Sequence, residues 1–149
     1  MMGLFWALLG ILSGAFIALQ APINAGLGRG LGLPIAATAA SFIAGTVLLI
    51  PIALAVSHMQ GVPIRWSAPP LWMYLAGGGL GAAYVTSVIV LTPKLGTAAT
   101  MALVVAGQLI AGLILDRMGA FELVVREITM GRIAGVVLLL VGALLIRFY

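Results

Sequence analysis

The sequence predicts an all-α integral membrane protein with five transmembrane helices. Hydrophobic residues make up 64% of the 149 residues and charged residues only 7%, whereas a soluble domain carries roughly 25% charged residues. The mean hydropathy of +1.30 agrees with this composition. The apolar residues form long uninterrupted stretches, each able to cross about 30 Å of hydrocarbon as a helix. Transmembrane strands are disfavoured, because they alternate in polarity over about ten residues.

The chain is expected to form a single transmembrane domain over residues 1–149. Its helices are predicted at residues 3–27, 34–56, 70–92, 95–115 and 130–146. Pro34 stands at a helix start, where proline is favoured, and Pro93 is expected to end the third helix. The first stretch is interpreted as a helix that stays in the protein, because it lacks the basic n-region of a signal peptide.

The connector over residues 119–128 has two open interpretations. Glu122 and Arg126 stand at i,i+4 spacing, which favours a short amphipathic helix at the membrane surface. An ordinary solvated loop explains the same residues equally well.

Basic residues outnumber acidic ones by 7 to 3, but they stand at the ends of the apolar stretches, which indicates loop anchoring and not nucleic-acid binding. Five helices place the connectors alternately on the two sides of the membrane. One side then carries four basic residues and the other three: Arg65, Arg117, Arg126 and Arg132 against Arg29, Lys94 and Arg147. This near-balance favours dual insertion and an antiparallel pair, although a few terminal charges would also suffice to set one orientation.

The first apolar stretch contains one polar interruption, which is the best candidate for a site. Gln20 and Asn24 stand four residues apart with Pro22 between them. Carboxamides at membrane depth are expected to face protein or a wet cavity, since an unsatisfied amide in hydrocarbon is costly. Pro22 is expected to break the helix and to free the carbonyl of Ala18.

Other polar side chains fall on single stripes of their helices and are candidates for the same cavity. Ser13 shares the Gln20 stripe, Ser41 lies on the second helix, Tyr84 on the third and Gln108 on the fourth. We predict that Gln20, Asn24, Gln108, Tyr84, Ser13 and Ser41 bind substrate. The alternative is that the hydroxyls bond their own backbone and the glutamines hold helices together.

The fifth helix has a stripe of small residues without polar neighbours. Gly131, Gly135 and Gly142 lie on one face and are predicted to pack against a second subunit.

The sequence lacks the residues that metal sites and enzyme active sites usually require. Cysteine is absent and histidine occurs once, so no metal site or cofactor is expected. No acid or base lies in the interior of a predicted helix, and no nucleophile–base–acid set is present, so the chain is not expected to be an enzyme. Asp116, at the end of the fourth helix, is expected to pair with Arg117 or a loop cation.

Three stretches carry a family resemblance: QAPINAGLGRGLG, AATAASFIAGTVLL and TPKLGTAATMALVVAGQLIAGLILDRMG. They resemble the five-helix, YdcZ-like branch of the drug/metabolite transporter superfamily. The resemblance implies half of an inverted-repeat carrier, which assembles antiparallel with a copy or a related five-helix subunit. It implies functional positions at Gln20, Pro22, Asn24 and Gln108. The glutamate that small multidrug carriers of this superfamily use in their first helix is missing here.

The expected function is that of a secondary transporter protomer in a bacterial-type inner membrane. It moves a small metabolite or drug-like solute by alternating access as an antiparallel dimer. Two alternatives stay open, a passive dual-topology channel and a non-transporting membrane assembly partner.

Overall fold

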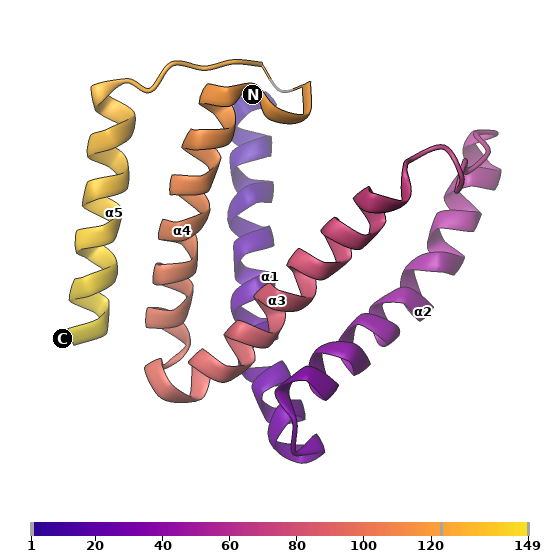
Figure 1. The fold of residues 1–149 in the computed structure, drawn as a ribbon, viewed down its shortest axis with the longest axis horizontal. Helices are drawn as coiled ribbons and strands as arrows, with labels where there is room; N and C mark the ends of the chain where they lie inside the picture. The colour runs from indigo at the N-terminus through magenta and orange to yellow at the C-terminus, as the bar shows by residue number, and fades with distance from the viewer. Residues whose placement is uncertain (1, 123, 149) are drawn as a thin grey trace. The chain divides into compact units, whose positions relative to one another are not determined.

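A computed structural model of the chain describes residues 2–122 and 124–148, and no strand occurs among them (Figure 1). The elements are α1 (Met2–Leu31), α2 (Pro34–Gln60), α3 (Leu71–Leu95), α4 (Thr97–Met118), the 3₁₀ turn η1 (Ala120–Glu122) and α5 (Met130–Phe148). All five α-helices are long and apolar enough to span a membrane; the shortest, α5, has 19 residues. At 1.5 Å per residue that is about 28 Å. The predicted all-α membrane fold with five transmembrane helices is confirmed.

The chain divides into two compact units, Met1–Val90 and Leu91–Tyr149. The first unit contains α1, α2 and most of α3, and the second contains the end of α3, α4 and α5.

Proline lies inside three of these helices, at Pro22, Pro51 and Pro93. The expected break at Pro22 is wrong, because α1 is helical from Met2 to Leu31. The expected end before Pro93 is also wrong, because α3 continues to Leu95. A proline removes one N–H donor from the helix, while the bonds on either side of it persist where no water competes for them.

In the first unit, α1 and α3 approach closely at one glycine. A β-carbon at Gly28 of α1 would lie 2.9 Å from Cγ2 of Ile89 on α3, closer than carbon atoms can pack. Ile89 belongs to a small buried cluster with Ala37 and Val85, against which Tyr84 packs. Gly28 therefore sets the distance between α1 and α3.

A pair of hydroxyls links α2 to α3 in the same unit. The Oγ1 atoms of Thr38 and Thr86 are 2.8 Å apart, and Thr38 also donates to the Pro34 carbonyl at 3.2 Å. Farther along, Phe42 packs over Gly81, at 3.4 Å from the position of an added β-carbon. A polar contact and an aromatic contact thus join α2 to α3, in addition to the apolar cluster of Ala37, Val85 and Ile89.

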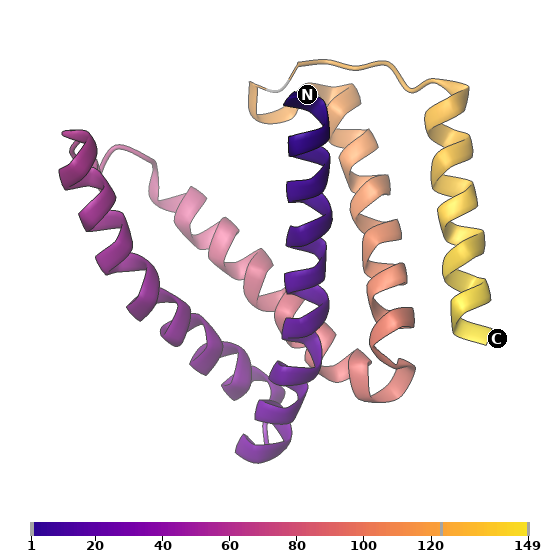
Figure 2. The ribbon, with the colours of Figure 1, turned by 180° about the vertical axis from the view of Figure 1, so that it is seen from behind.

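In the second unit, α4 and α5 lie side by side and run in opposite directions (Figures 1 and 2). Gly96, in the left-handed region with φ 82°, turns the chain from α3 into α4. The segment between α4 and α5 consists of η1 and a non-helical stretch over residues 124–129, so in the described part of this connector the loop interpretation holds. Leu123 and the side chain of Glu122 lie outside the described residues, and with them the expected Glu122–Arg126 pair.

Candidate functional site

The first unit contains a small hollow between α1 and α3. Its lining comes from two turns of one helix and one turn of the other: Ile17, Gln20, Ala21, Asn24, Tyr84, Val85 and Val88. The α1 residues recur every three or four positions, so they share one face of the helix. Ala21 is buried and lines the hollow, and its small side chain, with Gly28, lets α3 approach α1 closely.

Two of the three polar side chains of this hollow are shielded from solvent, whereas Gln20 is exposed. Asn24 is 5% exposed, and the Tyr84 hydroxyl oxygen is buried and has no hydrogen-bond partner. Burying a hydroxyl without a partner costs about 1–3 kcal/mol. A buried, unbonded hydroxyl beside two carboxamides leaves hydrogen-bonding capacity that a water molecule or solute can use.

The hollow is also small. Its volume is about 10 Å³, which is about the least that holds one water molecule. In this conformation the hollow therefore has room for about one water and not for a metabolite.

Two predicted site residues lie elsewhere in the first unit. The Ser13 hydroxyl donates to the Leu9 carbonyl of its own helix at 2.8 Å and is exposed. Ser41 is half-buried on α2 and, like Ser13, is not part of the lining of the hollow. Gln20, Asn24 and Tyr84 are thus the predicted residues that the structure brings together.

Gln108 lies in the second unit, in a much larger hollow between α4 and α5. The hollow has a volume of about 380 Å³ and is also lined by Asp116, Arg132 and Gly135. A volume of this size is in the range of small-molecule pockets.

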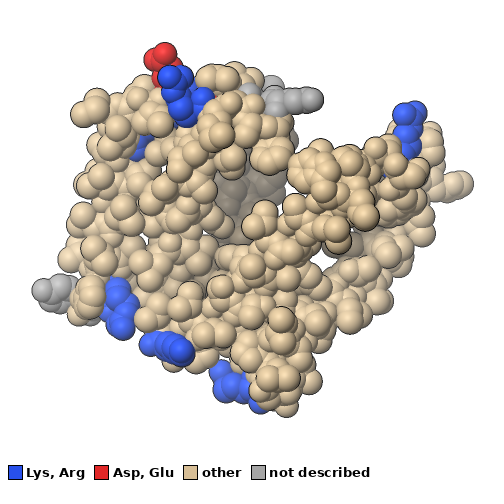
Figure 3. Space-filling view, in the orientation of Figure 1, with Lys and Arg blue, Asp and Glu red and all other residues tan. Residues whose placement is uncertain are grey.

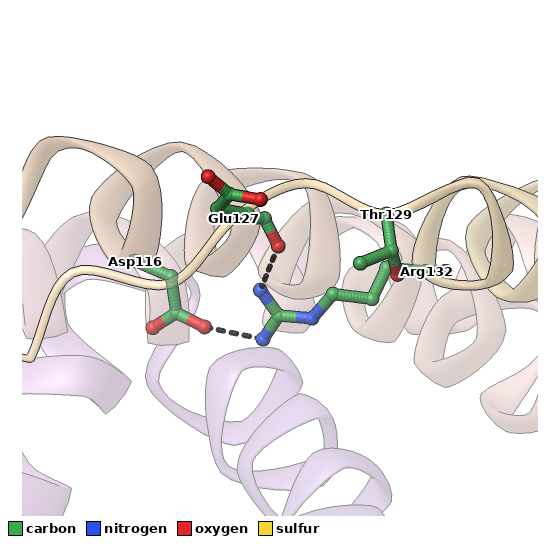
Figure 4. Close-up of polar contacts among 4 residues, drawn as sticks. All are labelled: Asp116, Glu127, Thr129 and Arg132. Carbon is green, nitrogen blue, oxygen red and sulfur yellow. Dashed lines mark hydrogen bonds and ion pairs between the residues drawn. The ribbon is translucent and has the colours of Figure 1, made fainter.

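Asp116 and Arg132 form an ion pair across this hollow. The guanidinium Nη2 lies 2.5 Å from Oδ2 of Asp116, and Nη1 donates to the Glu127 carbonyl at 3.4 Å (Figure 4). The expected pairing of Asp116 with Arg117 or a loop cation is therefore corrected, since its partner stands in the first turn of α5. Sequence spacing could have indicated this partner, because Arg132 and Gly135 stand at i and i+3 and therefore share the face of α5 that is turned toward α4.

On the face that Figure 3 shows, charged side chains of the second unit lie near the two ends of its helices, with uncharged surface between them. Among residues 2–122 and 124–148, no three His, Cys, Asp or Glu side chains gather as a metal site would require.

The three glycines predicted to pack against a second subunit are Gly131, Gly135 and Gly142, all on α5. Gly135 lines the hollow of Gln108, and Gly142 lines a second hollow between α4 and α5. An added β-carbon would meet nothing within 4 Å at either glycine, and at Gly131 it would meet the Thr129 Oγ1 at 4.0 Å. Their contact with a second subunit stays a prediction.

Comparison with known proteins gives one match. The model of the family DMT_YdcZ, described as "Putative inner membrane exporter, YdcZ", matches residues 5–145. No curated protein and no solved structure matches the chain. The match covers nearly all of the chain, and the five spanning helices agree with a multi-pass membrane protein. The chain therefore belongs to the YdcZ family of the drug/metabolite transporter superfamily, a family of inner-membrane transporters.

Proposed function

We propose that the chain is one protomer of a secondary transporter that moves a small neutral, zwitterionic or lipophilic solute by alternating access as an antiparallel dimer. The observation that carries the proposal is that Gln20, Asn24 and Tyr84 line one uncharged hollow between two spanning helices. Family membership supports transport in general, and the solute and dimer are our inference.

The chemistry of the hollow favours recognition by neutral hydrogen bonds. Each carboxamide offers two donors and an acceptor, and the Tyr84 phenol offers one donor and accepts as well. No charged side chain lines the hollow, so a strongly charged ion would lose its hydration without a compensating partner. Solutes with hydroxyl, amide or paired opposite charges fit this set best.

Solute binding requires the hollow to widen. Because its present volume suits about one water, α1 and α3 must separate to admit a solute. Movement of one inverted half against the other is the general way in which such carriers expose a midplane site alternately.

The antiparallel dimer rests on the charge balance and the half-size of the chain. Four basic residues against three give little preference for either orientation. Single cysteines introduced at Arg29 and at Arg65 would test it, since the chain contains no cysteine of its own. An antiparallel dimer predicts that each site is labelled from both sides of the membrane and that the two sites cross-link to each other between subunits.

Ser13, Ser41 and Gln108 stay candidate substrate ligands, and the channel and the non-transporting partner stay alternatives. Labelled-solute flux in proteoliposomes separates them, because a carrier saturates and counter-exchanges and a channel does neither. The non-transporting partner predicts no flux above that of empty vesicles.

Tyr84→Phe is the sharpest test of the site itself. The hydroxyl has no partner, so its removal is expected to leave thermal stability unchanged or slightly raised. If the hydroxyl binds solute, transport is expected to fall by about tenfold at subsaturating solute. The matched control is Ser87→Ala, which removes a hydroxyl of α3 that donates to the Ala83 carbonyl at 2.8 Å. Unchanged transport by Tyr84→Phe would exclude Tyr84 from the site.

A further inference from the structure

The interface between α4 and α5 contains two hollows in succession. The first, of about 380 Å³, includes Gln108, Asp116, Arg132 and Gly135 in its lining. The second, of about 400 Å³, is lined by apolar residues nearer the other ends of both helices, among them Val105, Leu139 and Gly142. Either volume is many times that needed by one water.

The two hollows follow one continuous face of each helix. Their lining residues recur at spacings of three and four: Ala98, Ala102, Val105, Leu109, Gly112 and Asp116 on α4, and Arg132, Gly135, Leu139, Gly142 and Ile146 on α5. Such spacing keeps the residues along one seam of an antiparallel helix pair. The hollows are therefore successive parts of one groove, named here the α4–α5 groove.

The glycines in this groove leave unfilled space between α4 and α5 and do not bring the two helix backbones into close contact. A β-carbon added at Gly112, Gly135 or Gly142 would meet no atom within 4 Å, unlike one added at Gly28. Close packing of α4 on α5 therefore does not require glycine at these three positions.

Polarity changes along the groove from one end to the other. At one end stand a carboxylate and a guanidinium whose side chains are 30% and 31% exposed, and Gln108 lies about two helical turns from Asp116 along α4. The other end offers apolar side chains only, Met101, Val105, Leu139 and Ile146 among them. Because Asp116 and Arg132 stand where α4 ends and α5 begins, the charged end belongs at one membrane surface, and the apolar part of the groove runs from there across the bilayer.

We propose that the α4–α5 groove binds a zwitterionic phospholipid with an ethanolamine headgroup. Its phosphate lies at the Arg132 guanidinium, its ammonium lies at the Asp116 carboxylate, and one acyl chain follows the groove past Gly135 toward Leu139. The adjacent opposite charges match a headgroup that carries both signs, and the carboxylate disfavours a headgroup with only negative charge. This inference does not rest on the hollow lined by Gln20, Asn24 and Tyr84, although Gln108, which lines the groove, is also a candidate substrate ligand.

Native mass spectrometry of the purified full-length protein tests the inference. The protein is exposed in turn to dioleoylphosphatidylethanolamine, dioleoylphosphatidylcholine and dioleoylphosphatidylglycerol, and retained lipid is counted per protomer. Phosphatidylethanolamine is expected to be retained best. Arg132→Gln and Gly135→Leu are each expected to lower its retention about tenfold, the first through the phosphate contact and the second by filling the groove.

Two matched controls are expected to retain the lipid as the wild type does. Arg147→Gln removes a cation at the far end of α5, and Gly107→Leu adds the same bulk to α4 outside the groove lining. Gly135→Leu leaves both charged residues in place, so it tests the groove even if Arg132→Gln does not assemble.

Three results would overturn the inference. Equal retention by groove and control variants would mean that the lipid is an unspecific annular one. Preference for phosphatidylglycerol would show that the headgroup assignment is wrong. Dissociation of a dimer by Gly135→Leu with unchanged lipid would assign the groove to a helix of a second copy.

Discussion

The hollow lined by Gln20, Asn24 and Tyr84 holds about 10 Å³ and no charge, whereas the α4–α5 groove has hollows of about 380 and 400 Å³ and ends on an ion pair. Both lie between two apolar helices, and both contain a glutamine. Their difference comes from what the helices place at the seam. In the first unit Ile89 lies close to Gly28, and in the second unit a β-carbon added at Gly112, Gly135 or Gly142 would meet nothing within 4 Å.

The comparison teaches that small residues in membrane helices serve two opposite purposes. At Gly28 the missing side chain lets two backbones approach, as is usual for small residues in membrane helix packing. At Gly135 and Gly142 the missing side chains leave volume unfilled. Spacing alone does not distinguish these purposes, since both sets recur at helical intervals.

The largest expected effect is the loss of transport when the Asn24 carboxamide of the first unit is replaced, compared with that of Gln108 in the second unit. Asn24→Leu is expected to lower transport roughly 10–100-fold, because it removes buried hydrogen-bonding groups from the proposed site. Gln108→Leu is expected to lower it at most about threefold, the size of an average interhelical hydrogen bond. The measurement is counter-exchange in proteoliposomes of the solute that the wild type carries best from a panel of labelled neutral and zwitterionic metabolites. Equal losses would extend the transport site to α4.

The second effect tests the tight glycine. Gly28→Ala is expected to destabilise the protein by about 1–3 kcal/mol through overlap with Ile89. Gly30→Ala, whose β-carbon meets nothing within 4 Å, is expected to be neutral or to stabilise by up to about 1 kcal/mol. Unfolding in mixed micelles measures both. Ile89→Ala in the Gly28→Ala background should restore part of the loss, and additive losses would argue against the contact.

The third effect concerns the hydroxyl pair in the first unit. Thr38→Val is expected to destabilise by about 0.6 kcal/mol, and by no more than about 1.7, through loss of the bond to Thr86. The control is Thr46→Val on the same helix, because the Thr46 hydroxyl donates to the Phe42 carbonyl of its own helix. The two variants should differ in the same unfolding assay, and identical values would mean that the interhelical bond contributes nothing.

The smallest effect concerns the ion pair in the second unit. Asp116→Asn is expected to cost up to about 1 kcal/mol, because both side chains are about one-third exposed and solvent screens the attraction. The loss should shrink as salt rises. A double-mutant cycle with Arg132→Gln measures the coupling, and a coupling of zero at low salt would show that the pair does not stabilise the unit.

Much of the fold follows from hydropathy, because each apolar stretch must be a helix to satisfy its backbone in lipid. The helix ends do not follow so closely. α1 extends beyond the predicted end at residue 27 and α2 beyond residue 56, through polar residues such as Arg29 and His58. Hydropathy marks the part of a helix that lies in hydrocarbon, and the helix itself continues into the interface.

The candidate site was predictable in part. Gln20 and Asn24 share a face by spacing alone, and Tyr84 was identified as an aromatic on the polar stripe of its helix. The pairing of Asp116 with Arg132 was not predictable from local spacing, because the two residues stand 16 positions apart and meet through the antiparallel course of α4 and α5. The same holds for Thr38 and Thr86, which are 48 positions apart.

The size of the hollow at Tyr84 has a consequence for the energy balance of the cell. A space for about one water cannot hold the continuous file of hydrogen-bonded waters along which protons hop. If the proposed transport pathway passes through this hollow, its closed form gives protons no route down the membrane potential. A carrier that rests in such a state can stay in an energised membrane without dissipating the gradient between transport cycles.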